Sequence, residues 1–132
     1  MVTDQRDESS STPIRVLVAH LPAAVVERIK PMIGAQQDML LVGEVDDHLE
    51  LLLAAGDNVN VVVLGASRVR PPPGICSHLL SEYPDVKILV LETGGTAAAF
   101  YWVGVCQQST RMKTPEALVS LIRRAYSGDS TI

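Results

Sequence analysis

Four short apolar runs recur along this chain, and a segment of helical spacing follows each of them. The runs are residues 16–19, 39–42, 61–64 and 88–91. Runs of this length that alternate with helical segments are typical of parallel strands, because a parallel connection must return across the sheet through a crossover helix. The pattern therefore predicts an α/β domain with a doubly wound parallel sheet and helices on both faces.

Helix-boundary signals support two of the connecting segments. Asp47, with Glu50 three residues later, has the form of a capping box, and Gly56 is placed to end that helix. Thr114 is a suitable N-cap for a last helix over residues 115–125, where apolar residues recur at helical spacing. Both segments are therefore predicted helices with defined ends.

Residues 96–103 are predicted as a further helix, with Gly104 as its stop. Three consecutive aromatic residues lie within it: Phe100, Tyr101 and Trp102. Consecutive residues cannot share one face of a helix, so at least one aromatic side chain is expected on the surface or in an interface. The fifth strand must then come from residues 105–110, whose polar character predicts an exposed edge strand.

Composition limits both the size of the protein and its partners. With 132 residues, of which 47% are hydrophobic and 20% charged, the chain is suited to one globular domain that needs no disulfide or metal to fold. The formal net charge of −4 argues against direct nucleic-acid binding by this domain, because such binding depends on Lys and Arg neutralising phosphates. The apolar runs are also too short to span a membrane, so no membrane partner is expected.

The ends of the chain and its two cysteines predict a cytoplasmic domain. Residues 1–13 form a polar, disordered tail, residues 14–126 form the domain, and residues 127–132 are a tail or the start of a linker. Cys76 and Cys106 lack the spacing of a metal or redox motif, so both are interpreted as idle thiols in a reducing compartment.

Four motifs, in this order and spacing, resemble the receiver domain of bacterial two-component response regulators. They are Ile-Arg-Val-Leu-Val-Ala at residues 14–19, Leu-Val-Gly-Glu at 41–44, Glu-Tyr-Pro-Asp-Val-Lys at 82–87 and Thr-Pro-Glu-Ala-Leu at 114–118. The match covers residues 14–126 and is nearest to receivers joined to helix-turn-helix output domains. The resemblance implies a flavodoxin-like domain whose five parallel strands have the order 2-1-3-4-5, in a two-component (phosphorelay) signalling pathway.

The resemblance also implies that the defining reaction of the family is lost. The position of the phosphorylated aspartate falls on Gly65, and the acidic pair that helps to hold Mg²⁺ falls on His20 and Leu21. Mg²⁺ prefers anionic oxygen ligands, which these residues do not supply. We therefore expect a degenerate, atypical receiver with no metal, no cofactor and no enzymatic activity. A lone histidine such as His20 is read as a hydrogen-bonded filler or as a ligand contact.

Two further family positions are replaced by charged residues. The hydroxyl residue that contacts the phosphoryl group falls on Glu92, with Thr93 next to it, and the family's lysine falls on Arg111, with Lys113 as the alternative register. An ion pair between Glu92 and Arg111 that fixes one conformation is one hypothesis, and neutral drift of an abandoned site is the other.

The expected function is that of a phosphorylation-independent receiver in signal transduction and transcription regulation, acting through protein contacts as a homodimer or on a helix-turn-helix domain in the same chain. In the family the output surface includes the fourth and fifth helices and the fifth strand. Its candidate residues here are Tyr101, Trp102, Arg111, Arg123 and Arg124. The alternative is a sensor that binds a small molecule in the former phosphorylation pocket, with Arg68 and Arg70 of a proline-rich loop at its mouth.

Overall fold

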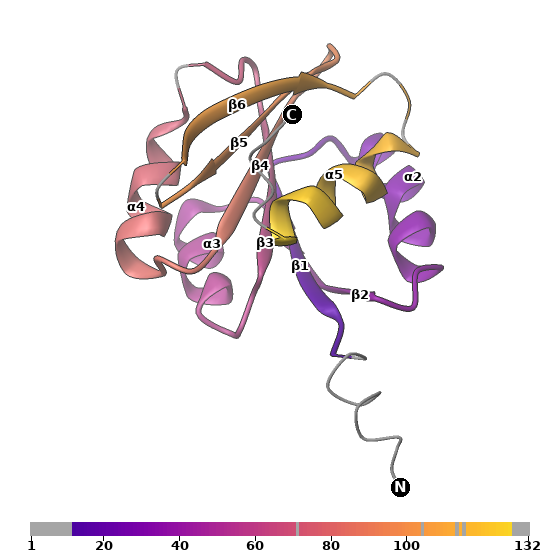
Figure 1. Cartoon of the computed structure of the whole chain (residues 1–132), viewed down its shortest axis with the longest axis horizontal. Helices are drawn as coiled ribbons and strands as arrows, with labels where there is room; N and C mark the ends of the chain where they lie inside the picture. The colour runs from indigo at the N-terminus through magenta and orange to yellow at the C-terminus, as the bar shows by residue number, and fades with distance from the viewer. Residues whose placement is uncertain (1–11, 71, 104, 113, 115, 128–132) are drawn as a thin grey trace, which may run out of the picture.

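A six-stranded sheet runs through the centre of the domain in a computed structural model, which describes residues 12–70, 72–103, 105–112, 114 and 116–127 (Figure 1). The strand order is β2-β1-β3-β4-β5-β6. The strands are β1 (Ile14–Ala19), β2 (Met39–Val45), β3 (Val61–Ala66), β4 (Lys87–Glu92), β5 (Ala97–Trp102) and β6 (Val105–Arg111). The helices are α2 (Ala23–Gly34), α3 (His48–Ala55), α4 (Gly74–Glu82) and α5 (Ala117–Ser127).

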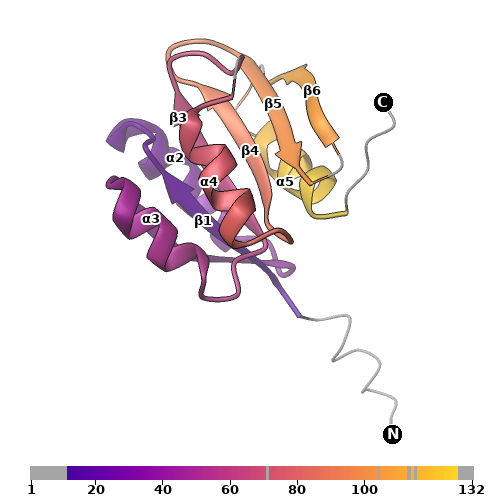
Figure 2. The same ribbon diagram turned by 90° about the vertical axis from the view of Figure 1, so that its left-hand side faces the viewer.

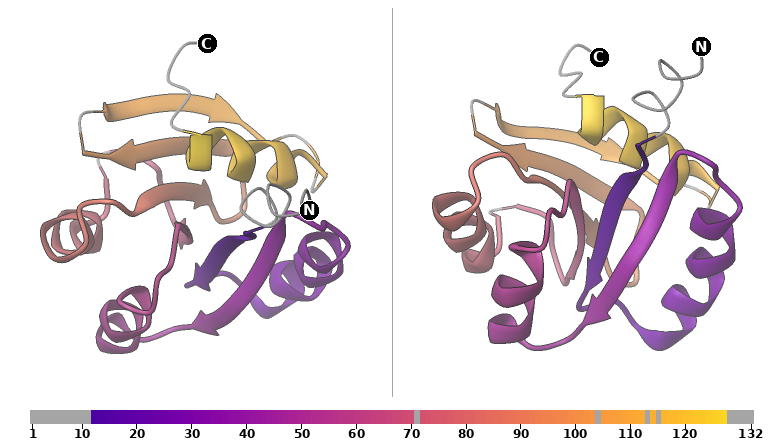
Figure 3. Two further views of the ribbon diagram at one scale, coloured as in Figure 1. Left: turned by 60° about the horizontal axis from the view of Figure 1, so that its bottom comes forward. Right: turned by 90° about the horizontal axis from the view of Figure 1, so that it is seen from below.

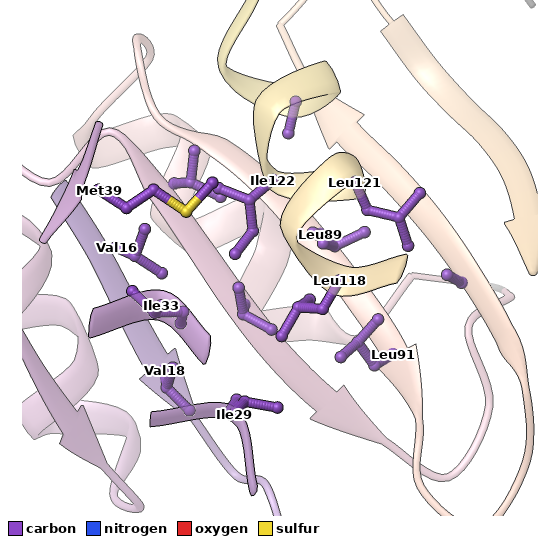
Figure 4. Close-up of a cluster of buried hydrophobic side chains, with 14 of the residues drawn as sticks. Val16, Val18, Ile29, Ile33, Met39, Leu89, Leu91, Leu118, Leu121 and Ile122 are labelled. Atoms are coloured by element: carbon purple, nitrogen blue, oxygen red, sulfur yellow. The ribbon is translucent and has the colours of Figure 1, made fainter. Parts of the chain in front are cut away.

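Helices cover both faces of the sheet, which explains why its central strands are apolar throughout. Helices α3 and α4 lie on one face, and α2 and α5 lie on the other (Figure 2, Figure 3). Side chains of a strand alternate between faces, so Val16 and Val18 of β1 pack with α2 and α5, whereas Leu17 packs with α3 and α4. The α2/α5 core is drawn in Figure 4, where Ile29 and Ile122 approach the sheet from the two helices.

The strand directions divide the sheet into two parts. Strand β1 pairs in parallel with β2 and β3, and β3 pairs in parallel with β4. Strands β4 and β5, and then β5 and β6, pair antiparallel. The predicted α/β domain with order 2-1-3-4-5 is therefore confirmed, while the expected five-stranded, wholly parallel sheet is wrong.

The predicted helix over residues 96–103 is also wrong, because this segment forms strand β5. Its residues alternate between the two cores: Ala97, Ala99 and Tyr101 face α3 and α4, and Ala98, Phe100 and Trp102 face α2 and α5. As a strand, the segment supplies hydrogen-bonding partners to the edge of β4 and buries all three aromatic rings. A single helix face could not bury three consecutive aromatic residues.

The remaining element predictions agree closely with the structure. The predicted strand over residues 105–110 is β6, which lies at the edge of the sheet as the last strand in the order. One carboxylate oxygen of Asp47 accepts hydrogen bonds from the backbone nitrogens of Leu49 and Glu50 at 3.0 and 3.1 Å, as expected for the cap of α3. Helix α5 begins at Ala117, whose nitrogen donates to the backbone oxygen of Thr114 at 3.0 Å.

Within the described residues, none of the helices has both the length and the apolar character that crossing a membrane requires. The predicted tail over residues 1–13 lies outside these residues except for its last two positions, and so does the C-terminal segment after Ser127.

Candidate functional site

The carboxyl ends of parallel strands are where a doubly wound sheet usually binds its ligand. The candidate residues predicted from the resemblance lie at or just after the ends of β1, β3 and β4 at this edge, and Arg111 ends β6. Strand β6 runs antiparallel to β5, which itself runs antiparallel to β4, so the end of β6 reaches the same edge of the sheet. All six candidate residues therefore lie near one edge.

Gly65 is enclosed by the segment that follows β1. A methyl group at this position would collide with the backbone oxygen of His20 and would lie 2.8 Å from Cδ2 of Leu21. Gly65 is itself buried. Glycine is therefore needed here because the β1–α2 connection passes directly over the end of β3, which leaves no room for a side chain of any kind. The sequence shows glycine where the resembled family carries an aspartate, but it does not reveal this close approach.

His20 adopts a conformation that few residues other than glycine accept. Its φ is +59°, in the left-handed region, and its backbone nitrogen donates to the oxygen of Val45 at 3.1 Å. Its ring meets the ring of His48 edge to face with 5.1 Å between centroids, and its Nε2 is buried with no hydrogen-bonding partner among the described residues. Nε2 of His20 therefore does not form the predicted hydrogen bond with any described residue.

Leu21 belongs to the hydrophobic core. Its side chain is buried and packs in the α2/α5 core. A cavity of about 100 Å³ remains beside it, lined by residues that include His20, Glu44 and Asp46. His20, Leu21 and Gly65 therefore lie close together, because the β1–α2 connection approaches the end of β3 at Gly65.

Glu92 and Thr93 begin the turn that connects β4 to β5. Oε1 of Glu92 accepts a hydrogen bond from the backbone nitrogen of Ala97 at 3.1 Å. The hydroxyl of Thr93 donates to the backbone oxygen of Ala66 at 3.2 Å, so it is used by the fold. A methyl group at Gly95 would collide with the Glu92 carboxylate, which shows how closely this side chain folds over the turn.

Arg111 lies on the far side of β5 from Glu92. Its Nη1 is 3.2 Å from Oγ1 of Thr96 and its side chain is exposed. Among the described residues, no ion pair joins Arg111 to Glu92, so the expected pair is not formed. The reason is topological: β5 is inserted between β4 and β6, and the register places Arg111 opposite Ala97. The alternative residue, Lys113, lies outside the described residues.

Glu92 and Arg111 nevertheless line a common pocket. It has a volume of about 440 Å³ and lies between the loop after β3 and the start of the β5–β6 hairpin. Arg68 and Arg70 line it from the loop, and Val69, Ala97 and Ala98 contribute apolar surface. The structure does not bring the predicted residues into one pocket: Glu92 and Arg111 line a pocket with the loop arginines, whereas His20 and Leu21 line a different one and Gly65 is buried next to them.

The predicted interface aromatics are buried, which corrects the expectation that they lie on the output surface. Tyr101 is 3% exposed and Trp102 is 7% exposed. The Tyr101 hydroxyl donates a hydrogen bond to the backbone oxygen of Val69, and burial raises the pKa of this hydroxyl. The Trp102 ring meets the Phe100 ring edge to face, with 5.7 Å between centroids.

The two arginines of α5 also make contacts within the domain. Nε and Nη2 of Arg123 lie 2.8 and 2.9 Å from the two carboxylate oxygens of Asp38, and Nη2 also donates to Gln36. The hydrogen bond from Arg123 lowers the pKa of Asp38. The guanidinium carbon of Arg124 lies 5.0 Å from the centre of the Phe100 ring. Arg123 and Arg124 therefore help to attach α5 to the domain.

The remaining groups that could bind a metal or act as a nucleophile are the acidic, histidine and cysteine side chains. No group of three or more His, Cys, Asp or Glu side chains there is arranged to hold a metal ion. Cys76 is buried, and desolvation raises the pKa of its thiol to about 12. The side chain of Cys106 lies outside the described residues.

Comparison of this chain with protein-family models, with curated proteins and with solved structures found no match. The functional argument therefore depends on the residues and their geometry.

Proposed function

We propose that this domain is a receiver-like regulatory module that acts without phosphorylation, through contacts with other proteins in a pathway of signal transduction and transcription regulation. The proposal includes a homodimer or a helix-turn-helix output domain as partner, a cytoplasmic location, and no catalytic step or cofactor in this domain. Two observations support it: the order of the parallel strands, and the close packing around Gly65, at the position where a receiver carries its aspartate.

The close packing at Gly65 is the observation that carries the proposal. A receiver transfers a phosphoryl group to a carboxylate at this position and needs room for the carboxylate, the phosphoryl group and Mg²⁺. Here the backbone oxygen of His20 and the side chain of Leu21 occupy that room. An aspartate at position 65 would have to displace the β1–α2 connection before it could react, so the domain is expected to signal by another route.

Phosphorylation of the intact chain tests this part of the proposal. Acetyl phosphate with Mg²⁺ is expected to leave the mass of the protein unchanged, because position 65 has no acceptor and no adjacent acidic pair. A receiver domain that retains its aspartate provides the positive control under the same conditions. Intact-mass spectrometry that finds a Mg²⁺-dependent gain of one phosphoryl group would refute the proposal.

The surface for protein contacts must differ from that of the family. Strand β5 takes the place of the family's fourth helix, and the candidate aromatics on it are buried. Among the described helices, α3 has the most exposed large apolar side chains, because Leu49 is 63% exposed and Leu53 is 70% exposed. The two residues are one helical turn apart and so lie on the same face. We therefore propose α3 as the contact surface.

Sedimentation velocity over a range of concentrations tests the contact. If α3 mediates self-association, Leu53→Glu should shift the protein to monomer, because it places a charge in the contact. Val103→Glu is the matched control, since Val103 is 60% exposed but lies in the β5–β6 turn. A wild-type protein that remains monomeric at about 100 μM would exclude a homodimer with a micromolar dissociation constant. Equal weakening by both variants would exclude α3 as its surface.

A second candidate function, a response to a small ligand, is favoured by the arginine-lined pocket of about 440 Å³. This pocket differs from the predicted one, because the former phosphorylation site is enclosed around Gly65. The open space lies further along the same edge of the sheet, beside Glu92 and Arg111.

A further inference from the structure

We propose that the pocket between the β3–α4 loop and the β5–β6 hairpin binds a small organic anion, through a carboxylate or phosphate group. The inference deepens the second candidate function, since it identifies the class of ligand and the residues that contact it. Arg68 and Arg70 reach the pocket from the loop, and Arg111 reaches it from the end of β6. These positive charges gather at one place in a chain whose net charge is −4.

The guanidinium groups of Arg68 and Arg111 have N–H donors available for a ligand. An arginine side chain carries five N–H donors in a planar arrangement that matches carboxylate and phosphate oxygens. Arg111 directs one of them, at Nη1, to Oγ1 of Thr96. Arg68 is exposed and has no hydrogen-bonding or ionic partner among the described residues. Two arginines from segments distant in the sequence can therefore bind one anionic group from two sides.

The floor of the pocket is apolar and favours an organic ligand over an inorganic ion. Val69 is buried, and Ala97 is half-buried and packs in the same α3/α4 core as Val69. The small side chains at the start of β5 leave open space where larger residues would fill it. An anion with a small apolar group can thus place its charge on the arginines and its apolar part on Val69 and Ala97.

Three hydrogen bonds hold the walls of the pocket in place before a ligand arrives. The hydroxyl of the buried Tyr101 donates to the backbone oxygen of Val69, between the two loop arginines. At the other end of the wall, the Thr93 backbone nitrogen and hydroxyl both donate to the backbone oxygen of Ala66. A binding surface that is ordered in advance loses less conformational entropy when it binds.

Glu92 opposes binding and so provides a discriminating test. Its carboxylate lines the pocket while Oε1 accepts the hydrogen bond from Ala97. Glu92→Gln removes the negative charge but keeps an oxygen that can accept this hydrogen bond. The variant should therefore retain the turn and bind anions more tightly. If Glu92 only maintained the turn, the substitution would leave the affinity for anions unchanged.

The test is a titration of the full chain, followed by ¹H–¹⁵N NMR at constant ionic strength. Benzoate, phenyl phosphate and inorganic phosphate serve as probes and distinguish a carboxylate from a phosphate ligand. We expect saturable shifts at amides near Arg68, Ala97 and Arg111, with the organic probes binding more tightly than inorganic phosphate. Absence of saturable binding by all three probes in the millimolar range would overturn the proposal.

Matched variants distinguish the site from a general effect of charge. Arg68→Gln and Arg111→Gln should each weaken binding about tenfold, as expected for the loss of a charged hydrogen bond. Glu92→Gln should strengthen it severalfold. Arg28→Gln is the control, because Arg28 is exposed on α2 and lies outside the pocket. Equal weakening by Arg28→Gln and Arg111→Gln would refute the site.

The result is independent of the phosphorylation test. A protein that fails to bind anions would still be expected to resist acetyl phosphate, because that expectation depends on Gly65. A protein that becomes phosphorylated would refute the regulatory proposal and leave the anion site standing. The two failures are therefore distinguishable.

Discussion

The four parallel strands and the β5–β6 hairpin belong to one sheet, yet they differ in how their sequences relate to their structure. In β1, β3 and β4, apolar residues face helices on both sides, and the surrounding turn signals agree with the strand assignment. In β5, three alanines precede three aromatic residues, and alanine favours a helix. The comparison shows that local preference determines an element only where the tertiary structure makes the same demand.

Residues 97–102 form a strand because the edge of β4 needs hydrogen-bonding partners. If residues 97–102 were helical, β4 would lack these backbone partners on that side. As a strand, the segment pairs with β4 and with β6 and places Tyr101 and Trp102 in opposite cores. Burying a large aromatic side chain stabilises the fold by about 1.5–3 kcal/mol, which exceeds the helical preference of a few alanines.

Among the variants that test this comparison, removal of Trp102 should change the stability most. It tests whether the β5–β6 hairpin belongs to the core. Trp102→Ala is expected to lower the free energy of unfolding by about 3–5 kcal/mol, since it leaves a cavity beside Phe100. Urea denaturation measures the change, and Val103→Ala, at an exposed neighbour, should change it by less than about 0.5 kcal/mol. Similar stability of the two variants would place Trp102 outside the core.

Gly65→Ala tests the corresponding point in the parallel part of the sheet. The added methyl group would collide with the backbone of His20, so the free energy of unfolding should fall by about 1–3 kcal/mol. Gly34→Ala is the matched control, because a methyl group at that helical position meets nothing within 4 Å. The control should be neutral or stabilising by up to about 1 kcal/mol. If Gly65→Ala is as stable as wild type, the edge is open enough for a side chain.

Tyr101→Phe sharpens the comparison by removing one atom from the hairpin. Without the phenolic hydroxyl, the backbone oxygen of Val69 loses its donor, and the free energy of unfolding should fall by about 1–2 kcal/mol. Tyr126→Phe removes the same atom from a side chain that is 45% exposed and should have no measurable effect. Chemical denaturation of both variants measures the difference, and an equal response would contradict a role for this hydrogen bond.

The smallest effect is expected where α5 contacts the turn before β2. Hydrogen bonds from Arg123 lower the pKa of Asp38, so the pair stabilises the folded state above the ordinary carboxyl pKa of about 4 and loses this contribution as the pH falls through the lowered value. Arg123→Gln should therefore cost about 0.2–1 kcal/mol at pH 7, because both side chains are nearly half exposed. The difference from wild type should shrink below pH about 4, and a difference that is constant with pH would exclude the ion pair as its cause.

The candidate site shows the same division between sequence and structure. The sequence shows no carboxylate at residues 20, 21 and 65, where the receiver family that it resembles carries acidic residues, and it shows the positive charge at Arg111. Sequence reasoning missed the closure of the β1–α2 connection over Gly65 and the insertion of β5 between Glu92 and Arg111. Both are contacts between segments distant along the chain, which a local pattern does not encode. The pair Gly94-Gly95 was a signal for the β4–β5 turn, since Gly94 has a φ of +86°.

The sequence by itself determined the α/β class, the first four strands with the helices between them, the cap of α3 and the edge position of residues 105–110. These features depend on local periodicity and on capping and turn chemistry, which are properties of short segments. Only the tertiary structure decided that residues 97–102 are a strand, that Tyr101 and Trp102 are buried, and that Arg68 and Arg111 line a common pocket. Those outcomes depend on which strand edge still lacks hydrogen-bonding partners, and which apolar surface is still uncovered, once the parallel strands have assembled. Neither can be read from the sequence of a single segment.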